Sequence, residues 1–102
     1  MRTDIRITGP ILKLLREFIC SPLEQKSGAD IALATGLASG TLYPILARLE
    51  AAGWLTSEWE NVDPSIVKRP RRRLYQLTTL GAKQTEASFR EHAPMKGVLA
   101  WQ

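Results

Sequence analysis

The chain has 102 residues, of which 44% are hydrophobic and 24% are charged, as expected for one small globular domain. No apolar run approaches the roughly 20 residues that a membrane-spanning helix needs, and the first residues contain no signal-peptide core. A single cysteine, Cys20, excludes an internal disulfide, and the sequence has no Cys/His cluster for a metal. We therefore expect a cytoplasmic domain without a metal or another cofactor.

The positive charge is concentrated in one place. The formal net charge is +4, from 14 basic and 10 acidic residues, and five of the basic residues lie in the segment Lys68–Arg73. This leaves 9 basic and 10 acidic residues in the rest of the chain. Such a cluster either binds nucleic acid or forms a solvated charged face, and the cluster alone does not separate the two.

The first helix is predicted from the Thr-Gly-Pro of residues 8–10, because Thr is a good cap and Pro is tolerated in the first turn. Apolar residues cover more than one of its faces: Ile11, Leu12, Leu14, Leu15, Phe18 and Ile19. This pattern fits a central core helix and equally a helix that also contacts another chain. Cys20, at its end, is expected to be a small buried residue, because nothing nearby would activate its thiol.

Two more helices follow, with a tight turn between them. Ser27 is the expected N-cap of the first, with Asp30 near the positive end of its dipole, and Gly36 ends it. The second opens at Ser39 and runs to Gly53, a typical helix stop. Two helices joined by a short turn that contains glycine match the helix-turn-helix pattern, which many helical hairpins share.

The pattern then changes to that of a β-hairpin. Residues 54–60 and 74–77 are rich in strand-forming residue types. The polar segment 61–70 between them contains two prolines and is predicted to be a long loop. The basic cluster Lys68–Arg73 therefore lies on the returning arm of this hairpin.

We expect a final helix over about residues 79–92, capped by Thr78 or Thr79 and ended by Pro94, and a short tail over residues 94–102. The order is then helix, helix, helix, strand, basic loop, strand, helix. This is the order of a winged helix-turn-helix domain, mainly α with a small β-hairpin (α+β), which here covers residues 1–93. In such a domain the third helix enters the major groove of DNA, and the hairpin, or wing, reaches phosphates or the minor groove beside it.

The helix expected over residues 39–53 has two distinct faces. Its core face carries four apolar residues at helical spacing: Leu42, Ile45, Leu46 and Leu49. Small residues, hydroxyl groups and one arginine on its other sides would allow close approach to a DNA groove. The candidate DNA contacts on this helix are Ser39, Gly40, Thr41, Tyr43, Pro44 and Arg48. Either Ser39 or Thr41 is the expected cap, so Pro44 lies near the N-terminal end and costs at most about one backbone hydrogen bond.

Arg48 has two possible roles. Its guanidinium can bond a phosphate, or read a guanine through two hydrogen bonds. Alternatively, it forms a surface ion pair with Glu50 or Glu58.

The basic cluster supplies the candidate contacts of the wing. Lys68 and Arg69, on the loop, are expected to reach DNA best. Side chains alternate along a strand, so Arg71 and Arg73 should share one face and Arg72 the other, and only one or two of these three can join the same surface. Each phosphate that is neutralised would make binding more sensitive to salt.

Two segments carry a resemblance to a known family. SGTLYPILARLEAAGWLTSEWE (residues 39–60), followed by a basic loop and RRLYQLTTLGAK (residues 72–83), resembles the PadR family of bacterial transcriptional regulators over residues 27–83. The resemblance implies a dimeric repressor whose winged helices bind an inverted repeat in double-stranded DNA. It also implies that Thr41, Tyr43 and Pro44 sit at the DNA-facing start of the recognition helix.

The family dimerises through C-terminal helices, often together with the first helix. The residues that this implies for a homodimer are Ile11, Leu12, Leu15, Leu80 and Phe89. Some members bind phenolic or planar aromatic effectors near the dimer interface, so a small aromatic effector is a further candidate partner. Trp101 either stacks on such an effector or packs on the body of its own chain.

Two other classes of function compete with this one. A winged helix can act as a protein–protein interaction module without sequence-specific DNA binding, although such a wing has no need for five cations in six residues. An enzyme would need catalytic residues, and the sequence has no nucleophile–base pair, carboxylate pair, metal cluster or Gly-rich phosphate loop.

Overall fold

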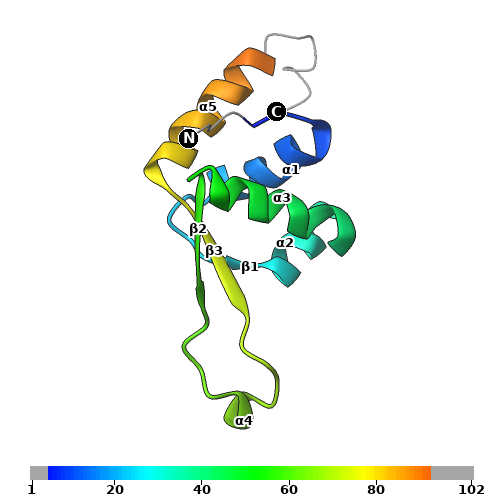
Figure 1. The fold of residues 1–102 in the computed structure, drawn as a ribbon, viewed down its shortest axis with the longest axis vertical. Helices are drawn as coiled ribbons and strands as arrows, with labels where there is room; N and C mark the ends of the chain where they lie inside the picture. The colour runs from blue at the N-terminus through cyan, green and yellow to red at the C-terminus, as the bar shows by residue number, and fades with distance from the viewer. Residues whose placement is uncertain (1–4, 93–102) are drawn as a thin grey trace.

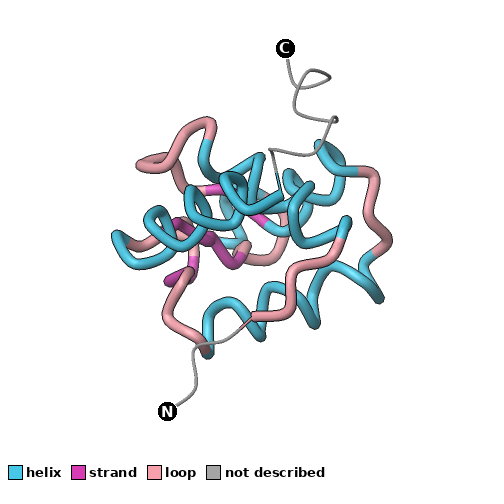
Figure 2. Tube along the Cα trace, turned by 90° about the horizontal axis from the view of Figure 1, so that it is seen from above, coloured by secondary structure: helices cyan, strands magenta, loops and turns pink. Residues whose placement is uncertain are grey.

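The computed structural model describes residues 5–92, which form five helices and three strands (Figure 1). The elements in chain order are α1 (Gly9–Ile19), β1 (Lys26–Ser27), α2 (Gly28–Thr35), α3 (Ser39–Ala51), β2 (Leu55–Trp59), α4 (Pro64–Val67), β3 (Arg73–Leu77) and α5 (Thr79–His92). Seen from above, helices make up most of the trace and strands only a small part of it (Figure 2). The predicted mainly α fold with a small sheet is confirmed.

Hydrogen bonds to neighbouring residues determine where α1 begins and ends. The Thr8 hydroxyl accepts a hydrogen bond from the Ile11 backbone N–H at 3.4 Å, which confirms Thr8 as the cap. At the other end the Cys20 backbone N–H donates to the Arg16 carbonyl at 3.2 Å. Cys20 is exposed, so its predicted burial is wrong. It lies just after the last helical turn, where the chain leaves the core.

The two helices of the helix-turn-helix begin differently. Ser27 caps α2, because its hydroxyl accepts from the Asp30 backbone N–H at 3.1 Å, and Gly36, with φ 74°, ends this helix. For α3, the prediction that Ser39 or Thr41 is the cap is wrong. Ala38 occupies the cap position, makes no side-chain capping bond, and its carbonyl accepts from the Thr41 N–H at 2.9 Å. Thr41 is therefore already helical.

Pro44 lies inside α3, as its sixth residue. The first i to i−4 bond of this helix runs from the Leu42 N–H to the Ala38 carbonyl. Pro44 therefore removes one interior bond, the one that a residue with an N–H would make to the Gly40 carbonyl. The lost bond lies near the exposed N-terminal end of the helix, where Gly40 is open to solvent.

The sheet has three antiparallel strands in the order β1-β3-β2. The predicted hairpin is confirmed as β2 and β3, with Leu55 opposite Leu77 and Trp59 opposite Arg73. The short strand β1, which pairs with β3, was not predicted. The loop of the wing also contains the single helical turn α4, which the sequence did not indicate. Asp63 caps this turn by accepting from the Ser65 backbone N–H at 2.9 Å.

The core lies between the helices and the base of the sheet. It comprises Ile11, Leu14, Leu15, Phe18, Ile31, Leu42, Ile45, Leu46, Leu49, Ala52, Trp54, Leu55, Tyr75 and Leu77. The wing extends beyond this core at one end of the molecule, and α5 lies at the other (Figure 1). No helix within residues 5–92 is long and apolar enough to cross a bilayer.

The residues expected at a dimer interface fall into two groups. Ile11 and Leu15 are 2% and 0% exposed, so they belong to the core of their own chain and are not available to a partner. Leu12 is half-buried, Phe89 packs partly buried against the core, and Leu80 is exposed. Only these three keep surface that a second chain could cover.

The start of α5 is fixed by Thr78, one of the two residues predicted to cap it. The Thr78 hydroxyl donates to the Gly53 carbonyl at 2.6 Å and accepts from the Gly81 backbone N–H at 2.9 Å. A side chain at Gly81 would overlap the Trp54 backbone carbonyl. The helix can therefore approach the start of β2 this closely only because residue 81 is glycine.

We predict that Gly81→Ala lowers the free energy of unfolding by about 2 kcal/mol or more, because backbone and not a flexible side chain must move. Gly9→Ala is the matched control, since a methyl group there meets nothing within 4 Å, and it should leave stability unchanged or raise it by up to about 1 kcal/mol. Urea denaturation measures both. Equal stability of the two variants would contradict the packing described for α5.

Candidate nucleic-acid interface

The two faces predicted for α3 are confirmed. Its core face is buried: Leu42, Ile45, Leu46 and Leu49. The candidate DNA contacts on its other sides are all exposed: Ser39, Gly40, Thr41, Tyr43, Pro44 and Arg48. The helix is therefore held by its leucines and presents small and polar groups outward.

Arg48 forms neither of the ion pairs considered for it. Glu50 instead accepts from the Ser57 hydroxyl at 2.6 Å, and Glu58 accepts from the Gln25 amide. Within residues 5–92 the exposed Arg48 guanidinium has no hydrogen-bond or ion-pair partner. Its donors remain available to an external acceptor.

Tyr43 leans from α3 onto the start of α2. A Cβ at Gly28 would lie 2.5 Å from the Tyr43 hydroxyl oxygen and 2.7 Å from the ring carbon Cε1. The ring thus occupies the space that a side chain at position 28 would need. Tyr43 remains 45% exposed, so it both packs on α2 and faces solvent.

Tyr43 also meets the wing. A cleft of about 330 Å³ is lined by Ser27, Gly28, Ala29, Tyr43, Arg69, Pro70, Arg71, Arg72 and Arg73. It brings one candidate of the recognition helix together with four of the five basic candidates of the wing. The remaining α3 candidates lie outside this lining, and Lys68 lies at the end of α4.

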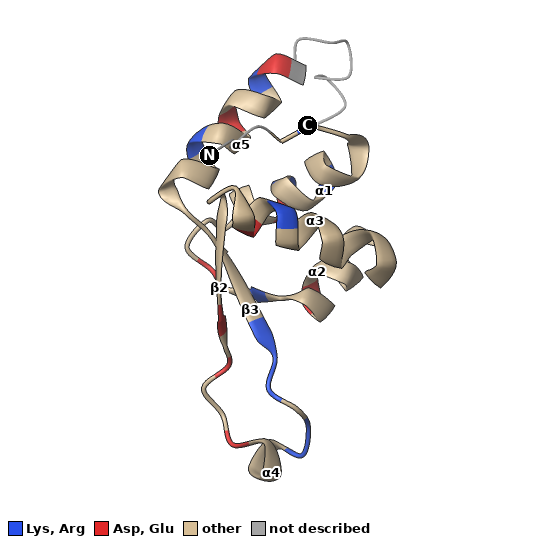
Figure 3. Ribbon diagram, viewed as in Figure 1, with Lys and Arg blue, Asp and Glu red and all other residues tan. Residues whose placement is uncertain are grey.

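The two arms of the wing carry opposite charges (Figure 3). The outgoing arm, from the end of β2 into the loop, contains Glu58, Glu60 and Asp63. The returning arm, which leads into β3, contains Lys68–Arg73. The cleft is lined by the returning arm. The electropositive edge of the wing is therefore the edge turned towards α2 and Tyr43.

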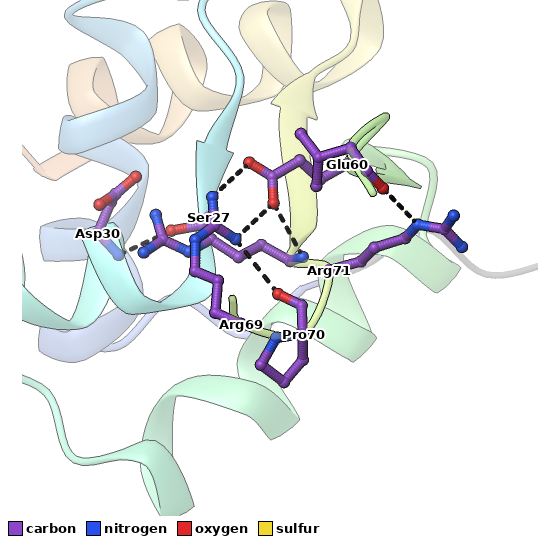
Figure 4. Close-up of polar contacts among 8 residues, drawn as sticks. Ser27, Asp30, Glu60, Arg69, Pro70 and Arg71 are labelled. Carbon is purple, nitrogen blue, oxygen red and sulfur yellow. Dashed lines mark hydrogen bonds and ion pairs between the residues drawn. The ribbon is translucent and has the colours of Figure 1, made fainter. Parts of the chain in front are cut away.

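Arg69 holds the two arms together. Its Nη1 and Nη2 donate to the two carboxylate oxygens of Glu60 at 2.7 and 3.0 Å, and the Arg72 backbone N–H donates to the same carboxylate at 3.2 Å (Figure 4). The bonds from Arg69 lower the pKa of Glu60 from 4.5 to about 2; burial opposes the shift and the Arg72 N–H adds to it. Arg69, expected to reach DNA best, is instead engaged within the wing.

The other wing cations differ in how firmly they are held. Arg71 donates from Nε to the Val62 carbonyl at 2.9 Å, and Arg73 donates from Nε to the Ser57 hydroxyl at 3.0 Å. The exposed side chains of Lys68 and Arg72 make no hydrogen bond within the described residues. Because β3 begins at Arg73, strand alternation does not govern Arg71 and Arg72, and that part of the prediction does not apply.

A second group of polar residues lies between α3 and the sheet. Glu50 and Tyr43 of α3 and Arg73 of β3 all lie close enough to Tyr75 to act on it electrostatically. Burial raises the pKa of Tyr75, the charges of Glu50 and Tyr43 raise it further, and Arg73 opposes them. The sequence did not single out Glu50, Ser57, Trp59 or Glu60 as part of a site, because their roles depend on partners that only the folded hairpin brings close.

These features define a class of protein. A helix-turn-helix whose second helix presents a polar face beside a basic β-hairpin is a winged-helix domain. In the part of the chain that the structure describes, no group of three or more His, Cys, Asp or Glu residues could hold a metal ion.

Solved structures of winged-helix regulators are similar to this chain. The structure of disulfide-formed AbfR, a protein of Staphylococcus epidermidis, has 27% identity and a TM-score of 0.71, over 91% of this chain and 62% of that chain. MepR, a transcription regulator of the Staphylococcus aureus multidrug efflux pump MepA, has 26% identity and a TM-score of 0.68, over 94% and 65%. Reduced AbfR bound to DNA has 29% identity and a TM-score of 0.64, over 81% and 54%.

The family itself follows from the sequence comparison. The model of the transcriptional regulator PadR-like family matches residues 23–87, so the chain belongs to this family of transcriptional regulators and not to a family of enzymes. A comparison with curated proteins gave no match. The chain spans between about half and two thirds of the length of these three solved structures.

The Glu60–Arg69 pair gives a prediction about pH. A lowered pKa means that the carboxylate stabilises the closed wing above pH 4.5, and that this contribution is lost as the pH falls through about 2. An NMR titration of the Glu60 carboxyl should give a midpoint near 2. In the Arg69→Ala variant the midpoint should return towards 4.5. A midpoint near 4.5 in the unmodified chain would contradict the pairing.

Proposed function

We propose that this chain is a repressor that binds double-stranded DNA sequence-specifically as a homodimer, with α3 in the major groove and the wing on the adjacent backbone or minor groove. One observation carries the proposal: Tyr43 of α3 and Arg71–Arg73 of the wing line the same cleft. The recognition helix and the cationic arm can therefore contact one duplex at the same time.

The outer face of α3 supports a role in the groove. Gly40 and Thr41 are small and exposed, which permits close approach of the helix to base edges. The Arg48 guanidinium has no partner within residues 5–92, which suits bidentate bonding to a guanine or to a phosphate. AbfR, which is similar over most of this chain, has been solved bound to DNA.

Hydrogen bonds within the wing reduce the number of cations that are available to contact DNA. Lys68 and Arg72 are the most available cations, and Arg71 and Arg73 keep Nη groups that make no hydrogen bond within the described residues. Arg69 contributes indirectly, by holding the returning arm against Glu60. We therefore propose at most four phosphate contacts per wing.

The dimer is proposed on α5 and the exposed side of α1, through Leu12, Leu80 and Phe89. A two-fold dimer would bind an inverted repeat, because operator symmetry mirrors protein symmetry. Such a regulator would act in the cytoplasm. Trp101, the candidate for stacking on an aromatic effector, lies outside the described residues, and the proposal does not include that effector.

One observation favours a second function. Ile66 and Trp59 on the wing are 74% and 61% exposed, which suits contact with another protein. In that alternative the wing would dock on a protein and the chain would not bind DNA sequence-specifically. The two experiments that follow separate the alternatives.

Isolation of the genomic DNA that the protein binds, followed by a footprint, tests specificity and symmetry together. We expect two protected half-sites related by inversion, with centres about one helical turn, roughly 34–36 Å, apart. The flank of each half-site should be protected by the wing. Recovery of random fragments with no discrete footprint would exclude the proposal and leave the protein-docking alternative.

Salt dependence tests the wing separately. Arg72→Ala should reduce the slope of log K against log salt by about 0.9 per protomer, because one phosphate contact is lost. Arg6→Ala is the control, since it also removes one positive charge from an exposed position, outside the proposed DNA contacts and outside the two helices of the proposed dimer. The control should leave the slope unchanged. If both variants change the slope equally, only the total charge matters and the assignment of the wing fails.

A further inference from the structure

Arg73 is held more firmly than the other available cations of the wing. Its Nε donates to the Ser57 hydroxyl at 3.0 Å, and its guanidinium carbon lies 4.9 Å from the centroid of the Trp59 ring. One end of the guanidinium is thus held by a hydrogen bond, and its central carbon lies over an aromatic face. Lys68 and Arg72, in contrast, have no such side-chain contacts within residues 5–92.

The strand register explains why these groups meet. Trp59 is paired directly with Arg73 across β2 and β3, and Ser57 is paired with Tyr75. Because side chains alternate along a strand, Ser57 and Trp59 share the face on which Arg73 lies. The same face carries the buried Leu55, so it is the core-facing side of the sheet, continued into the wing.

Glu50 sets the direction of the bond to Arg73. A serine hydroxyl has a single hydrogen, and Ser57 donates it to a carboxylate oxygen of Glu50 at 2.6 Å. The lone pairs of the Ser57 oxygen are therefore left for the Nε–H of Arg73. An acidic residue of the recognition helix thus orients a cation of the wing.

The rest of the Arg73 guanidinium remains available. Nη1 and Nη2 make no hydrogen bond within the described part of the chain, and Arg73 lines the cleft that also contains Tyr43 and Arg72. A guanidinium whose orientation is already fixed presents its two Nη donors as a fork that matches two oxygens of one phosphate. Because the Arg73 side chain is already ordered, it loses little conformational entropy when a phosphate binds.

We propose that Glu50, Ser57 and Trp59 are positioning residues that hold Arg73 ready to bind a phosphate of the DNA backbone. The inference rests on the proposed function. It also ranks the wing cations by how far each side chain is ordered before DNA binds. Arg73 is preorganised, Lys68 and Arg72 are ordered only on binding, and Arg69 is committed to Glu60. The same arrangement explains why Glu50, a negatively charged residue, lies beside the proposed DNA-binding surface.

A double-mutant cycle on a random-sequence DNA duplex tests the inference. Ser57→Ala should weaken binding about threefold to tenfold, the range expected when an ordered side chain becomes free. The salt slope should stay unchanged, because no charge is removed. Arg73→Ala should lower that slope by about 0.9 per protomer. In the Arg73→Ala background, Ser57→Ala should have no further effect.

Two variants keep the cycle interpretable. Thr56→Ala is the matched control, since Thr56 is the exposed neighbour of Ser57 on the opposite face of β2, and it should bind as the unmodified chain does. Ser57→Thr retains a hydroxyl and should restore tight binding. Circular dichroism of each variant checks that the fold is intact.

The outcomes distinguish failure of the positioning role from failure of DNA binding itself. Unchanged affinity of Ser57→Ala, or an equal loss in the presence and absence of Arg73, would overturn the positioning role while DNA binding by the unmodified chain stands. Absence of any DNA binding by the unmodified chain, even at low salt, would remove the proposed function and this inference with it.

Discussion

The register between β2 and β3 is the constraint on which the rest of the structure depends. At the base of the sheet Leu55 lies opposite Leu77, and burial of both in the core resists a slip of the pairing. The same register carries outward to the pair of Trp59 and Arg73. A shift of β3 by one residue would turn its side chains to the opposite face and separate Arg73 from Ser57 and Trp59. The hydrophobic core thus sets the position of charges well outside it.

The wing uses part of its positive charge to maintain its own shape. Glu60 engages Arg69 through two hydrogen bonds and receives a third from the Arg72 backbone. Two prolines and the capped turn α4 further restrict the loop. The available cations are therefore fewer than the sequence contains, but they are carried on an arm that is already closed. We therefore expect the arrangement of these cations, more than their number, to determine the proposed binding to DNA.

Local patterns in the sequence were sufficient to predict every element except β1 and α4, and one face of the candidate site. Helical spacing placed Leu42 and Leu49 in the core, and the capping role of Ser27 followed from residues within one turn. The two-residue strand β1 has no periodicity to detect. The pairing of Glu60 with a residue nine positions later needs the closed loop. Preference for a hydroxyl at a cap misplaced the start of α3, because backbone bonds to Ala38 begin that helix without one.

We propose that α3 and the returning arm of the wing form one DNA-binding surface. Amide chemical shifts, followed as a DNA duplex is added, test this proposal. We expect shifts of comparable size in the N-terminal half of α3, at residues 68–73 and at Gly28–Ala29, which line the cleft with Tyr43 and Arg71–Arg73. The outgoing arm, residues 61–63, should shift less. Shifts confined to α3, or larger on the outgoing arm than on the returning one, would contradict the account.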